Sequence, residues 1–130
     1  MFKVRIIKID WLDHDSKEAD VFFELGTGKY WAFCHPCVFC EGEERYVNID
    51  FLYLEDISWE TMFSSNIDEE MKLVQSSNDR DSYYCYGKII HINPIVVDCG
   101  DIQFDLGEMT NDNRVVGSWI YFIISRLDIF

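Results

Sequence analysis

The stretch from Tyr83 to the C-terminus constrains this chain more than any other. β-branched and aromatic residues are densest there, in YYCYGKIIHINPIVVDCGDIQFDL and, after a polar break, RVVGSWIYFIISRLDIF. The pairs Asn93-Pro94 and Cys99-Gly100 interrupt the first run, which therefore predicts strand, turn, strand, turn and strand. We expect the rest of the chain to pack on this β-rich stretch.

The preceding half of the chain also carries strand patterns. In residues 1–12 apolar and polar side chains alternate, but the phase slips by one residue between Ile6 and Ile7. Such a slip is typical of a β-bulge and predicts one long, bent strand. Residues 19–25 and 30–34 flank a glycine-containing turn and predict a hairpin, and residues 46–54 predict a further strand.

From residue 55 the apolar period changes to that of a helix. Trp59, Met62 and Phe63 stand at positions i, i+3 and i+4 behind Ser58, a favourable N-cap. Residues 57–75 are therefore expected to be a helical insertion.

A second short helix is predicted to begin at Asn66. Glu69 stands three residues later as a capping-box partner, and Met71 and Val74 would form the buried side. The polar run at residues 76–82 has almost nothing to bury, so it predicts the most flexible loop of the chain.

Six or seven short strands around one helical insertion predict a mainly β fold in a single domain, residues 1–130. The order of elements resembles that of an OB-type barrel with an extra strand, which implies a small, partly open β-barrel with one or two short helices. A β-sandwich is the alternative. Residues 115–124 are apolar in both alternating rows, and we expect them to lie inside the fold, beneath the helical insertion, rather than against a partner.

Composition places the chain among folded proteins. Apolar residues make up 48% and aromatic residues 16% of the sequence, too much core material for a disordered chain. Its apolar runs are far shorter than the roughly 20 residues that a bilayer span needs. The first dozen residues also lack the continuous apolar segment of a signal peptide. We therefore expect a cytoplasmic protein with reduced cysteines and no membrane partner.

The net charge points to the class of partner. Acidic residues number 24 against 11 basic ones, and the formal charge is −13. A surface of this sign repels phosphate backbones and attracts basic proteins, so nucleic acid is disfavoured as a partner. Small acidic domains of this kind include immunity proteins and antitoxins that block nuclease toxins, and we expect a non-enzymatic binding module of that type. An OB-like domain that binds nucleic acid or serves in a larger assembly is the alternative.

Three acidic clusters on predicted turns or helix starts are the candidate partner-binding residues. Loop carboxylates can be grouped into one field, whereas the pleat is expected to hold strand carboxylates apart. The second cluster is favoured because a glycine-containing loop can reach into a cleft. The clusters are Asp13, Asp15 and Glu18; Glu41, Glu43 and Glu44; and Asp68, Glu69 and Glu70.

Cys34, Cys37 and Cys40 have the two-residue spacing of zinc knuckles and resemble the start of a bacterial ferredoxin cluster motif. A four-ligand site needs a further cysteine or histidine, and Glu44-Arg45 stand where that motif has its fourth cysteine and proline. The three cysteines are therefore weak metal candidates. We expect small apolar side chains at a strand end, with no metal or cofactor.

No motif specifies catalysis. Walker, HExxH, GxSxG and GxGxxG sequences are absent. Cys85 and His91 stand too far apart on one strand to form a nucleophile and base, while Cys99, at a turn, has acidic neighbours that should raise its pKa. Four aromatic residues are candidates for stacking on bases, although cross-strand packing is the preferred interpretation. They are Trp31, Tyr83, Tyr84 and Tyr86.

Overall fold

The chain is mainly β, as predicted. A computed structural model describes all 130 residues, of which 48% lie in strands and 7% in helices. Two compact units divide the residues: unit 1 comprises Met1–Tyr53, Gln75–Tyr83 and Ile124–Phe130, and unit 2 comprises Leu54–Val74 and Tyr84–Ile123. One of the two sheets is nearly closed and barrel-like and the other forms half a barrel, which fits a small β-barrel fold. That the chain is a single domain remains a prediction.

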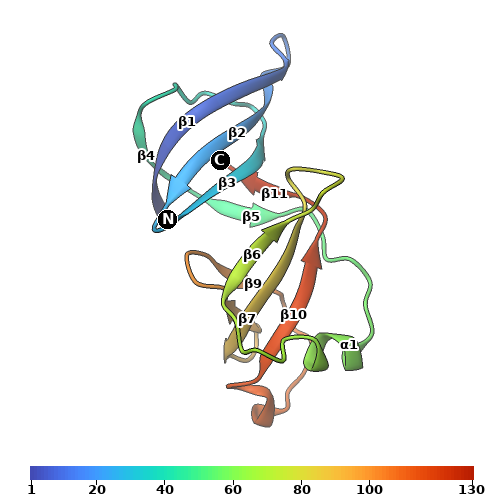
Figure 1. The fold of residues 1–130 in the computed structure, drawn as a ribbon. Coiled ribbons are helices and arrows are strands. Elements are labelled where there is room, and N and C mark those ends of the chain that lie inside the picture. Colours follow the sequence, from blue (N-terminus) through green and yellow to red (C-terminus); the bar gives the residue numbers. More distant parts are fainter. The chain divides into compact units, whose positions relative to one another are not determined.

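The sheet of unit 1 has six strands in the order β4-β1-β2-β3-β11-β5 (Figure 1). Their bounds are β1 Phe2–Asp13, β2 Glu18–Leu25, β3 Gly28–Cys34, β4 Glu44–Val47, β5 Ile49–Phe51 and β11 Leu127–Ile129. Six or seven strands were predicted for the whole chain, but the chain has eleven, because unit 2 adds a sheet of its own.

The predicted bulge and hairpin are both confirmed. The register between β1 and β2 shifts between Ile6 and Lys8, where the apolar phase slips in the sequence. β2 and β3 pair from Ala19 opposite Cys34 to Leu25 opposite Gly28. Because side chains alternate between faces, the inner rows of these strands form the core of unit 1. This core includes Val4, Ile6, Val21, Phe23, Ala32, Leu127 and Ile129, each no more than 2% exposed.

The strand predicted over residues 46–54 is shorter and interrupted. Asn48 separates β4 from β5, and its backbone N–H and C=O both bond to Phe130. β5 pairs with β11, and β11 also runs parallel to β3, so a three-residue strand lies between two others. The break lets the chain leave the edge next to β1 and join the sheet again at its other end.

Unit 2 contains a sheet of five strands, in which β10, β7, β8 and β9 follow one another and β6 pairs with β7. The bounds are β6 Lys72–Gln75, β7 Tyr83–His91, β8 Val96–Asp98, β9 Gln103–Asp105 and β10 Trp119–Ile124. Its core includes Cys85, Ile89, Ile95, Val97, Ile102, Phe104, Ile120 and Phe122, each no more than 2% exposed.

The first predicted helix is confirmed as α1, Trp59–Ser64. Ser58 is its N-cap, since the Ser58 hydroxyl accepts the backbone N–H of Thr61 at 3.1 Å. Met62 is buried, and the exposed ring of Trp59 packs on Phe63. None of the helices could span a bilayer, because α1 has six residues and the 3₁₀ helix η1, Asn113–Val115, has three.

The second predicted helix is wrong. Asn66 closes a loop: its Oδ1 accepts the N–H of Glu70 at 2.9 Å, and its Nδ2 donates to the Glu70 carbonyl at 2.9 Å. The same Nδ2 donates to the Ile120 carbonyl at 3.2 Å, which ties the loop to β10. An asparagine side chain competes with helical backbone bonds in this way. Met71 and Val74 are exposed beside and within β6 instead of being buried.

β10 begins later than predicted. Val115 belongs to η1, and the strand begins at Trp119. Ile120, Phe122 and Ile124 are buried, whereas Trp119, Tyr121 and Ile123 are half-buried. One row is therefore interior, as expected, and the other is partly open to solvent.

Gly87 allows β7 and β8 to lie unusually close together. A Cβ atom at this position would stand 2.5 Å from the Asp98 carbonyl oxygen and 2.7 Å from Val97 Cγ1. Because the first of these contacts is with backbone, Gly87→Ala is expected to destabilise the protein by about 2 kcal/mol or more. Urea unfolding followed by tyrosine and tryptophan fluorescence measures the loss, and an unchanged midpoint would contradict this account of the close approach.

Candidate functional site

The register of unit 1 brings four aspartates into one row. Asp10 on β1 pairs with Asp20 on β2, Asp20 pairs with Phe33 on β3, and Phe33 pairs with Asp128 on β11. Asp50 on β5 pairs with Asp128 and ends the row. Neighbouring strands lie about 4.8 Å apart and paired residues share a face. The sheet therefore gathers strand carboxylates, contrary to the prediction that the pleat holds them apart.

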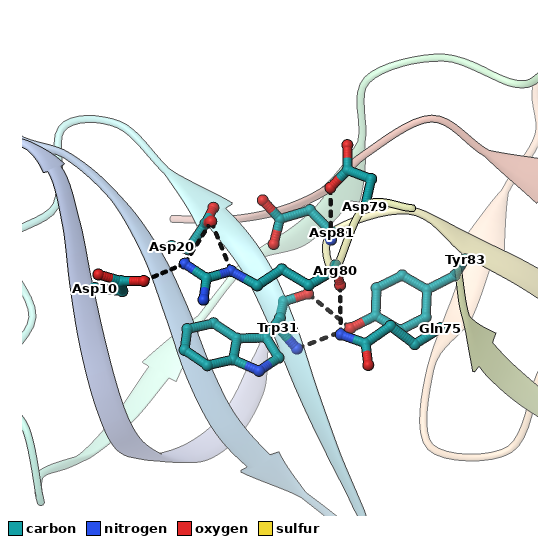
Figure 2. A network of polar contacts seen from close by, with 8 residues as sticks. All are labelled: Asp10, Asp20, Trp31, Gln75, Asp79, Arg80, Asp81 and Tyr83. Carbon is teal, nitrogen blue, oxygen red and sulfur yellow. Dashed lines mark hydrogen bonds and ion pairs between the residues drawn. The ribbon is translucent and has the colours of Figure 1, made fainter. Parts of the chain in front are cut away.

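Arg80 covers one end of this row (Figure 2). Its Nε donates to Asp20 Oδ2 at 2.9 Å, and its terminal nitrogen bonds to Asp10 Oδ2. The guanidinium carbon lies 4.0 Å from the centroid of the Trp31 ring. Trp31 in turn stacks on Phe22, with centroids 5.0 Å apart. Arg80 is thus held by carboxylates on one side and an aromatic face on the other, an arrangement that favours Arg over Lys.

Asp81 forms a buried carboxyl pair with Asp20. The two residues are 6% and 7% exposed, and Oδ1 of each has no partner among the donors of the protein. Burial raises the pKa of Asp81 well above its usual range, and a hydrogen bond to Asp20 and the Asp20 charge raise it further. A proton on Asp81 that is donated to Asp20 would relieve the lack of a donor at this carboxyl pair.

The loop predicted to have almost nothing to bury is anchored instead. Gln75 Nε2 donates to the Arg80 carbonyl at 2.9 Å, and the Asp81 carbonyl accepts the N–H of Leu127 on β11 at 2.7 Å. The Ser82 hydroxyl donates to the Ile124 carbonyl at 3.0 Å. A hydropathy argument misses these contacts because they are hydrogen bonds of polar side chains and backbone groups, and because half-buried Arg80 neutralises the buried Asp20.

The two buried carboxyl groups of this network are not accessible to a substrate. A general acid must lie within hydrogen-bond reach of its substrate, whereas Asp20 and Asp81 are buried residues, only 7% and 6% exposed. Arg80 is engaged by Asp10, Asp20 and Trp31 (Figure 2). The network therefore joins residues 76–82 to the sheet of unit 1, and a binding surface has to be sought elsewhere.

The first predicted acidic cluster lies at the turn between β1 and β2. Asp13 Oδ1 accepts the backbone N–H of Asp15 at 3.0 Å, and these bonds hold the pKa of Asp13 below its usual value. Asp15 is exposed and Glu18 half-exposed. This turn presents negative charge to solvent, and its role in binding a partner stays a prediction.

The second cluster, which was favoured, is occupied by its own chain. Glu41 Oε1 accepts the N–H of Ile9 at 2.9 Å, and Glu43 Oε1 accepts the N–H of Cys40 at 2.9 Å. Glu44 bonds to Arg5 at 2.8 Å. These carboxylates fix the loop along β1, which leaves them less available to a partner than the sequence suggested.

The third cluster lies in unit 2, beside a pocket of about 260 Å³. Asp68 and Glu69 are exposed, and Glu70 forms an ion pair with Lys72. The Lys72 ammonium also lies 5.3 Å from the centroid of the Tyr86 ring. A cation is thus held between a carboxylate and an aromatic face at this pocket. Its lining residues are Ser65, Asn66, Ile67, Asp68, Glu70, Lys72 and Tyr86.

Half-buried aromatic rings gather on the outer face of the unit 2 sheet. Tyr84 and Tyr86 alternate with buried residues along β7, and Tyr121 does so along β10. Tyr121 lies 6.4 Å from Tyr84, with ring planes 11° apart, and 5.2 Å from Tyr86. Trp119 lies beneath the Lys88 ammonium, 5.5 Å from ring centroid to nitrogen. We call Tyr84, Tyr86, Trp119 and Tyr121 the aromatic face.

Only part of this face was foreseen. Tyr84 and Tyr86 were stacking candidates and do lie on it, whereas Tyr83 is buried and its hydroxyl bonds to both backbone groups of Trp31 in unit 1. Trp119 and Tyr121 were missed as surface residues because β10 was expected to be interior. The alternation of the strand contained the signal, since one row had to face outward.

The cysteines do not form an exposed cluster. Cys34 and Cys37 are buried, Cys40 is exposed, and no three metal-ligating side chains converge anywhere in the structure. Burial raises the pKa of the Cys34 thiol to about 12. Cys99 is buried and not exposed, and burial more than its neighbour Asp98 raises its pKa. Buried thiols of this kind are poor nucleophiles and poor metal ligands.

Comparison of the chain with protein-family models, curated proteins and solved structures found no match. The function therefore has to be argued from the charges and surfaces of the two units.

Proposed function

We propose that this chain is a non-enzymatic module that binds a basic protein. The charge imbalance of unit 2 carries the proposal: it has eleven acidic side chains and only three basic ones. Two of these cations, Lys72 and Arg114, form ion pairs within the unit, and Lys88 lies over Trp119. Most of the carboxylates are therefore uncompensated, a condition that attracts cationic proteins and accelerates their association.

The basic partner that we favour is a nuclease toxin, which this chain would inhibit as an immunity protein or antitoxin. A nuclease groove is basic because it receives phosphates, and carboxylates can occupy the same sites. We place the module in the cytoplasm, where five free cysteines stay reduced. This identification rests on charge and size.

Affinity capture with the full chain tests the proposal. Host lysate is passed over the immobilised chain with and without prior nuclease digestion, and bound material is eluted with rising salt. We expect a retained protein of net positive charge in both cases, because exposed charges are screened as salt rises. Retention of nucleic acid, or of no basic protein, would support the alternative of a nucleic-acid-binding or assembly domain instead.

If an acidic surface of unit 2 attracts the partner, neutralising its exposed carboxylates should lower the association rate. Asp68→Asn with Glu69→Gln should slow association with the captured protein about two- to fivefold at low salt and flatten its salt dependence. Asp15→Asn with Glu18→Gln removes the same charge from a turn in unit 1 and is the matched control. Stopped-flow mixing at two salt concentrations measures both variants. Equal slowing would indicate that net charge alone matters, and two unaltered rates would contradict an acidic binding surface.

A further inference from the structure

Arginine is held in the same way three times in unit 1. Arg80, Arg126 and Arg45 lie 4.0, 4.1 and 5.0 Å from the ring centroids of Trp31, Phe33 and Phe39. Each also bonds to a carboxylate: Arg80 to Asp20, Arg126 to Asp128 and Arg45 to Glu43. A planar cation that is stacked on a ring and bonded at its edge combines two favourable interactions.

Unit 2 has rings and carboxylates but no arginine over any ring. Its one arginine, Arg114, is paired with Asp112, and its side chain is 90% exposed. Lysines lie over two rings of the aromatic face, Lys72 over Tyr86 and Lys88 over Trp119. Each lysine has a nearby acid, since Lys72 bonds to Glu70 and Lys88 pairs in register with Asp98. The remaining two rings, Tyr84 and Tyr121, lie nearly parallel.

We infer that the aromatic face of unit 2 is the docking surface for arginine side chains of the basic partner, with Tyr84 and Tyr121 as the rings on which a guanidinium stacks. The inference rests on the proposed function and names the group that is recognised. Charge complementarity selects this occupant, because the surrounding unit has eight more acidic than basic side chains. Half-buried tyrosines also suit the role, since they offer rigid contact area at a low entropic cost.

The acidic loop beside the face strengthens this choice. Asp68 and Glu70 line the same pocket as Tyr86, whose ring lies 5.2 Å from that of Tyr121, so carboxylates stand beside the aromatic face, where the guanidinium edge of an arginine needs acceptors. Asn66, buried and bonded to the Glu70 backbone and to Ile120 on β10, holds this loop against the sheet. The loop and the rings therefore form one preorganised surface.

A peptide series tests the inference. The full chain is titrated at low salt with three peptides of equal length that carry arginine, lysine or the neutral isostere citrulline. We expect the arginine peptide to bind most tightly and the citrulline peptide not to bind. In the unaltered protein the ring resonances of Tyr84 and Tyr121 should shift on binding, a measurement that needs no variant.

Two variants and one control locate the site. Tyr84→Leu and Tyr121→Leu keep apolar area, but each removes one ring of the aromatic face, and each should weaken binding of the arginine peptide about three- to tenfold. Tyr46→Leu removes a ring that is 64% exposed on β4 of unit 1 and should leave the affinity unaltered. Thermal unfolding confirms that each variant is folded.

The outcomes separate this inference from the proposed function. If the arginine peptide binds but neither tyrosine variant weakens it and neither resonance moves, the aromatic face is not the docking surface, although the module still binds basic chains. If no cationic peptide binds and no basic protein is captured, the proposed function fails as well. If single-stranded oligothymidine binds and the tyrosine variants weaken that binding, the rings stack on bases and the inference is overturned.

Discussion

Asp81→Asn is expected to raise the stability of the protein at pH 7 by roughly 2 to 4 kcal/mol and to flatten its dependence on pH. In the native state the Asp81 carboxyl keeps its proton, because it is buried against Asp20. An asparagine has the same shape, carries no charge, and can donate from Nδ2 to the Asp20 carboxylate in place of the protonated Asp81 carboxyl.

The direction in which stability changes with pH follows from the number of protons that the folded and unfolded states bind. Asp81 has a raised pKa when folded, so the folded state holds one proton more than the unfolded state above the ordinary value of 3.8. The stability that this group contributes is complete below that value and is lost as pH rises toward the folded pKa, by up to about 1.4 kcal/mol per pH unit. The facing charges of Asp20, Asp79, Arg80 and Arg126 modulate the size of the effect but not its direction.

Urea unfolding at several pH values between 4 and 8 measures this dependence. Asp50→Asn, which removes an exposed carboxylate from β5 in the same sheet, is the matched control and should leave the pH profile as it is. A steep profile that persists in Asp81→Asn would show that Asp20 and Asp81 do not share a proton.

Arg80→Met is expected to cost about 3 kcal/mol. Methionine keeps an unbranched stem for packing on Trp31 but leaves the buried Asp20 carboxylate without its cation, and breaking such a pair from one side is strongly destabilising. Arg80 is 35% exposed as a side chain, so we place the loss at the lower end of the usual range for buried pairs.

Arg5→Met is the control, because Arg5 and Glu44 form an ion pair in which both side chains are about half-exposed. Such pairs contribute under about 1 kcal/mol. A double-mutant cycle with Asp20→Asn then isolates the interaction: if the ion pair holds the segment, the second change should recover much of the loss. Equal losses for Arg80→Met and Arg5→Met would mean that Arg80 is an ordinary surface residue.

Local patterns predicted the elements that depend on local forces. The phase slip at Ile6 and Ile7 identified the bulge, the glycine turn after Leu25 identified the hairpin, and Ser58 identified the start of α1. Each of these signals lies within a few residues of the feature that it predicts. The mainly β fold class followed from the same alternation.

The predictions that failed concern features that depend on contacts between residues far apart in the sequence. Asn66 looked like a helix cap because its bond to Ile120, 54 residues away, cannot be read locally. Likewise, Arg80 meets Asp10 and Asp20 at separations of 70 and 60 residues, so residues 76–82 looked like a solvated loop. The row of aspartates could not be predicted either, because it depends on the register of five strands.

The candidate site likewise has one part that the sequence predicts and another that depends on the fold. Sequence reasoning identified the acidity, and it named Tyr84, Tyr86 and the cluster at residues 68–70, which the structure places in unit 2. Three contacts that bear on the site could not be read from the sequence: the bonds that occupy Glu41 and Glu43, and the approach of Tyr121 to Tyr84. Charge can be counted from a sequence, but its availability depends on the fold.

The position of β11 implies an order of assembly for the sheet of unit 1. β1, β2 and β3 follow one another in the chain and pair through short turns, so this meander can form from neighbouring residues. β11 pairs with β3 through Asp128 and Phe33, which stand nearly a hundred residues apart, and closing so long a loop is entropically costly. Until Leu127–Ile129 arrive, β3 and β5 each present an open edge to which another strand can add. The nascent or partly unfolded chain is therefore most exposed to misassembly at the place where the two shortest strands of this sheet, β5 and β11, will lie.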